Sequence, residues 1–497
     1  MFEKITPEQA GFSAESVIEF INKAQKRGAS THGILMMKGD KIFAEAYWKP
    51  FHQDFCHRMY SQTKSFVGIA IGLLQEEGKL SIHDKIVDYF PEKINGELAK
   101  YLKDQTIKDM LTMSTIGNPA DYWFTSKYDD RTQLYLNDDR NGAPHASGTI
   151  WQYDSSGSQV LSALVEKLSG KSLLDYMKEK LFNEMGTFQT ATVLKCRNGD
   201  SWGDSAMVCT LRDIASFGRL LMQKGVWNGK RLMNEEYIRE ATSKVVDNKM
   251  DAHYCAYHQG YGYQIWTVAN GGFMFNGMGD QVTLCYPEQD LLFTFNSDNQ
   301  GTNLVRQAFV VNFEDMFVEK AQNTPLPENK AANEKLAKLI DGLKLRAVQG
   351  EEDSAFRQEL DGQEYICDEN PMGITKFSFH FTDKTKGELR YTKASGEKVL
   401  PFGVNYNEFG KFPEYGYSND FGGVRTTDGF LYDDAVSFVW LEEKKLLVYA
   451  QVIDRYFGNV SMIFAFKGDY ATAKFTKAAE DFMWDYNGVM SARKAKK

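Results

Sequence analysis

A serine and a lysine three residues apart are the pair in this chain best suited to nucleophilic chemistry. Ser61 and Lys64 stand directly before the apolar run of residues 66–74. A serine hydroxyl is a poor nucleophile near neutral pH, so it needs a base within hydrogen-bond distance. Three residues make about one helical turn, which places the amine beside the hydroxyl, and burial among apolar neighbours favours a neutral amine that accepts a proton. The pattern predicts an acyl-transfer nucleophile opening a buried helix, whose N-terminus favours developing negative charge.

A second segment offers a group that can exchange protons with this pair. Tyr153 and Ser155 lie in a turn before a helix-like run at residues 159–168. A tyrosine serves as a general acid or base when a nearby cation stabilises its phenolate, and Lys64 would be such a cation. Ser155 would then bond Lys64 or the substrate. Taken alone, the segment is equally consistent with a packed tyrosine and a helix-capping serine, and Ser61-x-x-Lys64 with a capping serine and a solvated lysine.

A third segment, residues 273–284, contains Asn276, Gly277 and Met278. Gly277 lets a strand backbone approach a ligand closely. The Met278 amide would then face the reacting carbonyl oxygen together with the Ser61 amide, forming an oxyanion hole in which each donor contributes about 3 kcal/mol. The alternative is an ordinary glycine-rich hairpin.

In this order the three segments resemble the penicillin-recognising serine hydrolases, the superfamily of serine β-lactamases, D-Ala-D-Ala peptidases, class C β-lactamase-like esterases and 6-aminohexanoate-dimer hydrolases. Residues 106–114, 209–218, 225–230 and 260–263 are also similar to that family, so the resemblance covers roughly residues 5–320. It implies Ser61 as the acylated nucleophile, and Lys64 and Tyr153 as general acid/base. The substrate-binding residues that it implies are Ser155, Asn276, Gly277 and Met278.

The third motif departs from the family pattern. Where β-lactamases and D-Ala peptidases carry Lys-Thr-Gly, this chain has Phe275-Asn276-Gly277, which lacks the cation that binds a substrate carboxylate. Losing such a charge-assisted contact costs about 1.5–3 kcal/mol. We therefore expect a serine hydrolase that cleaves a carboxylic ester or small amide through an acyl-enzyme. The alternatives are a non-catalytic, penicillin-binding-protein-like binding or regulatory protein, and a β-lactamase or D-amino-acid peptidase.

For residues 1–322 the resemblance implies an α/β (α+β) β-lactamase/transpeptidase-like domain, an antiparallel sheet flanked by helices with an all-α subdomain. The residue pattern itself predicts an amphipathic helix and several strands. The helix covers residues 14–26, a hairpin covers 33–44, and strands cover 263–268, 281–286 and 291–296.

The character of the chain changes after residue 317. Two prolines mark a linker, and an amphipathic helix over 331–345 follows it, so residues 323–350 are expected to be linker and helix. Short alternating strands then predict a C-terminal antiparallel β-sheet or lipocalin-like barrel domain over residues 351–497. They are expected at 376–381, 389–391, 435–440, 446–453 and 461–466.

Composition narrows the partners. The chain has 497 residues and a net charge of −9, which argues against nucleic acid and against an anionic membrane surface. Neither a secretory signal nor an apolar run of about 20 residues is visible, so a cytoplasmic location is expected. His253, Cys255 and His258 lack a second ligand pair, and we expect no metal and no cofactor. The expected partner is a small-molecule ester or amide, and the sequence does not indicate the oligomeric state.

Overall fold

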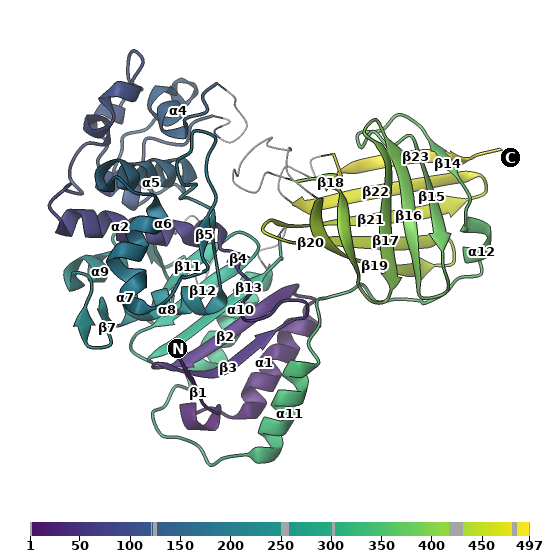
Figure 1. Ribbon diagram of the computed structural model, residues 1–497, viewed down its shortest axis with the longest axis horizontal. Helices are drawn as coiled ribbons and strands as arrows, with labels where there is room; N and C mark the ends of the chain where they lie inside the picture. The colour runs from purple at the N-terminus through teal and green to yellow at the C-terminus, as the bar shows by residue number, and fades with distance from the viewer. Residues whose placement is uncertain are drawn as a thin grey trace. The chain divides into compact units, whose positions relative to one another are not determined.

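The computed structural model describes residues 2–120, 122, 127–249, 258–300, 304–416, 431–479 and 485–496. The chain divides into two compact units, of which the first spans Met1–Lys344 and the second begins at Leu345 (Figure 1). The first unit contains all three segments singled out from the sequence.

The first unit is built on a sheet of eight described strands in the order β1-β3-β2-β13-β12-β11-β10-β9. The strand pairs are antiparallel except for β1 and β3, which run parallel. Pairing of β13 with β2 joins the two ends of this unit, with Thr294 opposite Leu35. The strands are β1 Glu3–Lys4, β2 Thr31–Lys38, β3 Lys41–Tyr47, β9 Gly260–Tyr261, β10 Trp266–Thr267, β11 Phe273–Gly277, β12 Gln281–Tyr286 and β13 Leu291–Ser297.

Helices cover both faces of this sheet because its strands are apolar on both sides. Along β13, Phe293 and Phe295 pack with α1, α10 and α11, whereas Leu292 packs into the core on the opposite face, which α8 covers. This alternation is the two-residue period of a strand. The helices are α1 Ala14–Lys26, α8 Leu211–Met222, α10 Leu304–Phe313 and α11 Lys330–Asp341.

The residues between β3 and β9 in the sequence form a mostly helical part that contains α2, α4 and α5 (Figure 1). Its centre is α2, Thr63–Glu76, in which every residue from Thr63 to Leu74 is buried. A helix that is apolar all round must be enclosed by other elements, and α5 and α6 pack against it. The remaining elements are α3 Ile107–Leu111, α4 Arg131–Asn137, α5 Ser155–Ser169, α6 Leu173–Met177, α7 Asn183–Met185, α9 Glu235–Ala241, and the short strands β4 His57–Arg58, β5 Thr192–Val193, β6 Met207–Cys209, β7 Val226–Trp227 and β8 Lys230–Arg231.

Two sequence expectations change in the first unit. The strand expected over residues 263–268 is confined to β10, because Gln264 has a φ of 60° and Tyr263 N–H bonds the carbonyl of Ala241. The helix expected within the linker is α11, and it belongs to the first unit: Ala332 and Leu336 are buried in the core that α1 also lines (Figure 1).

In the second unit the described strands close into a barrel. β17 pairs with β16 on one side and with β19 on the other, so nine strands form a ring, and β18 is added on β19. Aromatic rings fill it, among them Phe379, Phe402 and Phe438. The elements are α12 Arg357–Leu360, β14 Tyr365–Cys367, β15 Lys376–Phe381, β16 Lys386–Lys393, β17 Gly396–Val404, β18 Glu408–Tyr415, β19 Leu431–Glu442, β20 Lys445–Ile453, β21 Phe457–Lys467, β22 Tyr470–Ala479 and β23 Gly488–Lys494. The predicted barrel is confirmed, with five described strands, β14, β17, β18, β22 and β23, that the sequence pattern did not identify.

No helix in the described part of the chain combines the length and the apolar character needed to cross a bilayer.

A buried pair of histidines connects β2 and β4. His32 Nδ1 lies 2.9 Å from His57 Nε2, and the His57 Nδ1–H donates to the Arg58 carbonyl. Burial lowers the pKa of His57 to about 3 and that of His32 well below its usual value.

Both histidines are therefore expected to destabilise the fold in acid. Below pH 6.5 the histidines bind protons in the unfolded chain but not in the folded chain. The free energy of unfolding is therefore highest above pH 6.5 and falls as the pH decreases toward 3. Each histidine contributes up to about 1.4 kcal/mol per pH unit. We expect His57→Gln to lower the slope by about half between pH 6.5 and 5 in urea unfolding, because His32 keeps its own contribution, and we expect His83→Gln, at an exposed position, to leave the slope unchanged. Equal slopes in wild type and His57→Gln would contradict the assignment.

Candidate active site

Ser61 lies in a 3₁₀ turn, Tyr60–Gln62, immediately before α2. The preceding Tyr60 has a φ of 48°, a left-handed conformation that is costly for a bulky side chain. Its ring is held by the Arg58 guanidinium, 4.4 Å from the ring centroid. Thr283 Oγ1 on β12 donates to Gln62 Oε1 at 2.8 Å. The turn that carries Ser61 contacts α2 on one side and β11 and β12 on the other, so its strained conformation is held in place.

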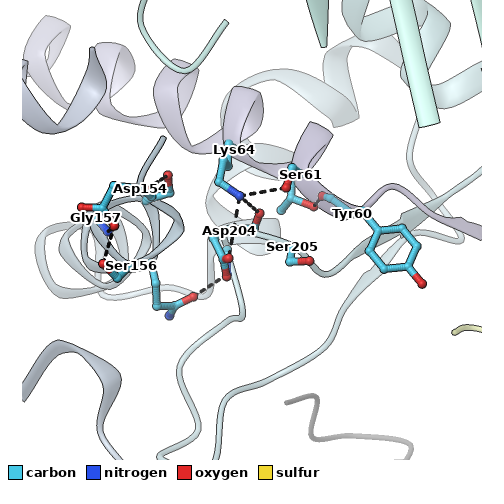
Figure 2. Close-up of polar contacts among 12 residues, drawn as sticks. Tyr60, Ser61, Lys64, Asp154, Ser156, Gly157, Asp204 and Ser205 are labelled. Carbon is cyan, nitrogen blue, oxygen red and sulfur yellow. Dashed lines mark hydrogen bonds and ion pairs between the residues drawn. The ribbon is translucent and has the colours of Figure 1, made fainter. Parts of the chain in front are cut away.

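Lys64 points back from the first turn of α2 toward Ser61 (Figure 2). Its Nζ donates to Ser61 Oγ at 2.9 Å and to the Asp204 carbonyl at 2.7 Å. The Asp204 carboxylate Oδ2 lies 3.7 Å from the same nitrogen. The lysine side chain is 1% exposed, so bulk water does not compete for these contacts. The predicted contact between hydroxyl and amine is present in the structure.

The position of α2 is set by close packing against the segment before β10. A Cβ placed on Gly68 would lie 2.6 Å from the Tyr263 carbonyl oxygen, so only glycine permits this approach. Ser65 Oγ donates to the Gln264 carbonyl at 2.9 Å. These contacts fix the helix that carries Lys64 against the segment before β10.

Tyr153 reaches the same amine from the turn before α5. Lys64 Nζ lies 5.1 Å from the centroid of its ring, and the ring stacks on Trp266. The turn is fixed by Asp154, which accepts from Gly157 N–H at 3.0 Å (Figure 2). Asp154 also accepts from Thr115 Oγ1 at 2.7 Å. The tyrosine is therefore adjacent to the Ser61–Lys64 pair.

Ser155 is the first residue of α5 and is half-buried. The hydrogen bonds recorded for Lys64 in the described part of the chain go to Ser61 and Asp204. A contact between Ser155 and Lys64 therefore stays a prediction.

The third segment approaches the nucleophile along β11. A Cβ placed on Gly277 would lie 2.3 Å from the Met59 carbonyl oxygen and 3.3 Å from the Ser61 nitrogen. Glycine is thus required for this strand to pass beside the nucleophile turn. Met278 follows Gly277 directly, and 43% of its surface is exposed. Because Gly277 lies beside Ser61, the Met278 and Ser61 amides belong to neighbouring stretches of backbone. The oxyanion hole itself stays a prediction.

Arg306 is a positive charge beside this segment, and Asp280 neutralises it. Arg306 Nε donates to Asp280 Oδ1 at 2.9 Å, and its Nη2 donates to the Gly277 carbonyl at 3.3 Å. Asp280 is buried, and burial raises its pKa although Arg306 lowers it in part. Asn276 has a buried Oδ1 that accepts no hydrogen bond from the described residues.

Asp204 is a member of the site that sequence reasoning missed. It precedes β6, and its carboxylate is buried beside Lys64. Burial raises the pKa of Asp204 to about 6, although Lys64 and Arg58 lower it in part. No motif marks this residue, because 140 positions separate it from Lys64 and only the fold brings the two together.

Comparison with known proteins agrees with this architecture. The family model described as Beta-lactamase matches residues 17–308, which is more than half of the chain. The chain belongs to the Beta-lactamase family. The expected superfamily and the expected fold are thereby confirmed, and the protein is a member of the β-lactamase-like serine hydrolases.

Individual relatives of this Beta-lactamase family member are distant. The 6-aminohexanoate-dimer hydrolase of Paenarthrobacter ureafaciens is 24% identical over 269 residues, covering 50% of this chain and 67% of the relative. Penicillin-binding protein 4* of Bacillus subtilis is 27% identical over 154 residues, covering 29% of this chain and 32% of the relative. A solved structure named "Putative 6-aminohexanoate-dimer hydrolase from Bacillus anthracis" superposes with a TM-score of 0.52 at 18% identity, covering 66% of this chain and 89% of the other. That likeness concerns the fold alone.

Of the histidine and cysteine cluster considered from the sequence, His253 and Cys255 lie outside the described residues.

Proposed function

We propose that this protein is a serine hydrolase that cleaves a carboxylic ester or a small amide through an acyl-enzyme on Ser61. The observation that carries the proposal is the 2.9 Å contact between Lys64 Nζ and Ser61 Oγ in a buried position at the start of α2. A buried amine held against a hydroxyl is the arrangement that activates a weak nucleophile.

In the proposed reaction Ser61 Oγ attacks the carbonyl carbon while its proton passes to neutral Lys64. The Oγ–C bond forms, and the π electrons of the carbonyl move to its oxygen, which the Ser61 and Met278 amides stabilise. The alcohol or amine then leaves with a proton from Lys64 or Tyr153. Water attacks the carbonyl carbon of the acyl-enzyme, and one of its protons passes to the same pair. The Oγ–carbon bond breaks, that proton passes on to Ser61 Oγ, and the carboxylic acid is released.

The substrate is proposed to lack an essential carboxylate. The third segment supplies Asn276 in place of a lysine, and the nearby Arg306 is engaged by buried Asp280. A carboxylate brought to this place would lose its hydration and would have to compete with Asp280 for Arg306. A neutral ester or amide incurs no such cost. The partner is therefore proposed to be a small uncharged acyl compound, with no metal or organic cofactor in the reaction.

The charge of the substrate is expected to affect the rate of hydrolysis. Between two p-nitrophenyl esters of equal acyl length, the neutral ester is expected to have a kcat/KM about tenfold or more above that of the ester with a terminal carboxylate. Asn276→Lys is expected to narrow the difference, because it adds the missing cation. Steady-state hydrolysis of both esters by both proteins measures it. A wild type that prefers the carboxylate ester would overturn the proposed substrate class and favour the peptidase alternative.

A further inference from the structure

We propose that Asp204 is a positioning residue of the active site, whose carboxylate holds the Lys64 amine against Ser61 and sets the pH at which that amine accepts the serine proton. The inference rests on the proposed function, because it assigns a role within the same site. It adds a residue that no sequence pattern marked.

The geometry gives Asp204 two separate contacts with one nitrogen. Its main-chain oxygen accepts from Lys64 Nζ at 2.7 Å, and its side-chain Oδ2 lies 3.7 Å from the same atom (Figure 2). Together with Ser61 Oγ at 2.9 Å, these contacts fix the direction of the amine. A buried pair at this separation attracts strongly, because little water screens it.

The second observation is that the Asp204 carboxylate is incompletely satisfied. Oδ1 is buried and accepts no hydrogen bond of ordinary geometry from the residues that the structure describes, although the side chain is only 3% exposed. Trp202 and the main-chain N–H of Asp204 support the carboxylate less than the charge of Lys64 does. A buried carboxylate with an unpartnered oxygen is costly as an anion. Its main support is therefore the charge of Lys64, so the protonation of each group depends on the other.

The other charged and titratable groups around Lys64 and Asp204 do not remove the interaction between these two charges. Arg58, from β4, donates to the Ser205 carbonyl at 3.0 Å and remains a cation at every relevant pH. Burial raises the pKa of both Tyr122 and Cys196, which also feel the charge of Asp204, so both stay neutral near pH 7. Tyr153 also faces the pair, with its ring centroid 5.1 Å from Lys64 Nζ.

The Asp204 carboxylate acts on the amine through its charge, because the 3.7 Å between Nζ and Oδ2 is longer than a hydrogen bond. An anion beside an amine favours the charged form of the amine, so Asp204 is proposed to set the pH at which Lys64 can take the Ser61 proton. That proton passes from Oγ to Nζ as the Oγ–carbon bond forms, and the carboxylate stabilises the ammonium ion that results.

The test is the pH dependence of covalent labelling in the full-length chain. The second-order rate of fluorophosphonate labelling at Ser61 is measured by intact mass from pH 5 to 9 in wild type and in Asp204→Asn, which keeps the main-chain contact and nearly the same volume. The acid limb is expected to move to lower pH by about one unit or more, because Lys64 loses the anion that favours its charged form. The plateau rate is expected to fall about tenfold to a hundredfold, because the amine is then a weaker and less well oriented base.

The matched control is Glu314→Gln. Glu314 is a buried carboxyl in the same unit that accepts from Tyr286 at 3.0 Å, and it lies on the helical layer behind the sheet, away from Lys64. Its profile is expected to match wild type. An Asp204→Asn profile with an unchanged midpoint, whatever its plateau, would overturn the inference and leave Asp204 a structural residue.

If Asp204→Asn does not fold, as judged by circular dichroism, Asp204→Ala is measured in the same way and the same shift is expected. Failure of wild type to label at any pH would instead overturn the proposed function, and this inference with it. Labelling of wild type with unshifted variants would overturn this inference alone.

Discussion

Replacing Ser61 by alanine is expected to lower ester hydrolysis by about 10⁴-fold or more while leaving the fold intact. The substitution removes the only oxygen that forms the proposed covalent bond. It takes away one half-buried hydroxyl and one hydrogen bond from Lys64, so the free energy of unfolding should change by no more than about 1 kcal/mol. Steady-state hydrolysis of a p-nitrophenyl ester and urea unfolding measure the two quantities.

Ser65→Ala is the matched control for that variant. Ser65 lies one residue beyond Lys64 on α2 and donates to the Gln264 carbonyl, so it is a buried serine of the same helix that touches a main-chain oxygen instead of Lys64. We expect Ser65→Ala to stay within about tenfold of wild-type activity and to lose about 1 kcal/mol of stability. Retained hydrolysis in Ser61→Ala would refute the assignment of the nucleophile.

The second large effect is expected for Lys64→Met, which keeps a straight side chain and removes the amine. Activity should fall about 10³-fold or more, because Ser61 then has no base. Stability should also fall, since removing one member of a buried ion pair leaves the other without a counter-charge. Burial already raises the pKa of Asp204 to about 6, so the loss should be larger at pH 8 than at pH 5, where Asp204 is protonated.

A double variant separates the two consequences of losing Lys64. In Lys64→Met/Asp204→Asn the buried anion is gone, so the free energy of unfolding at pH 8 should rise toward that of wild type. Hydrolysis should stay as low as in Lys64→Met. Recovery of activity in the double variant would contradict a base role for Lys64 and point to a purely structural one.

Local sequence pattern predicted the elements whose signals are contained in a few neighbouring residues. The helix over 14–26, the hairpin around Gly39 and the strands at 281–286 and 291–296 all have clear periodicity, and the structure contains each of them. The placement of Ser61 at the start of a buried helix was likewise readable, because the apolar run after it requires enclosure on all sides.

Sequence reasoning missed strands whose residues are atypical of strands, and it missed a site residue that only the fold brings into place. β17 contains Pro401 and two glycines and is a strand because it lies between β16 and β19. Asp204 escaped for a related reason: a lone acidic residue in a loop becomes part of a site only when β6 and α2 are brought together. Sequence reasoning can identify a motif, but it cannot identify a residue that joins the motif through the fold alone.

Intact mass spectrometry after exposure to a fluorophosphonate tests the central claim, that Ser61 is an activated nucleophile, most directly. The serine oxygen displaces fluoride from phosphorus, and the proton leaves through Lys64, so the adduct reports both groups without knowledge of the natural substrate. The account predicts one adduct on wild type and none on Ser61→Ala. No adduct on wild type, or equal adducts on both proteins, would contradict it and favour a binding protein built on the same fold.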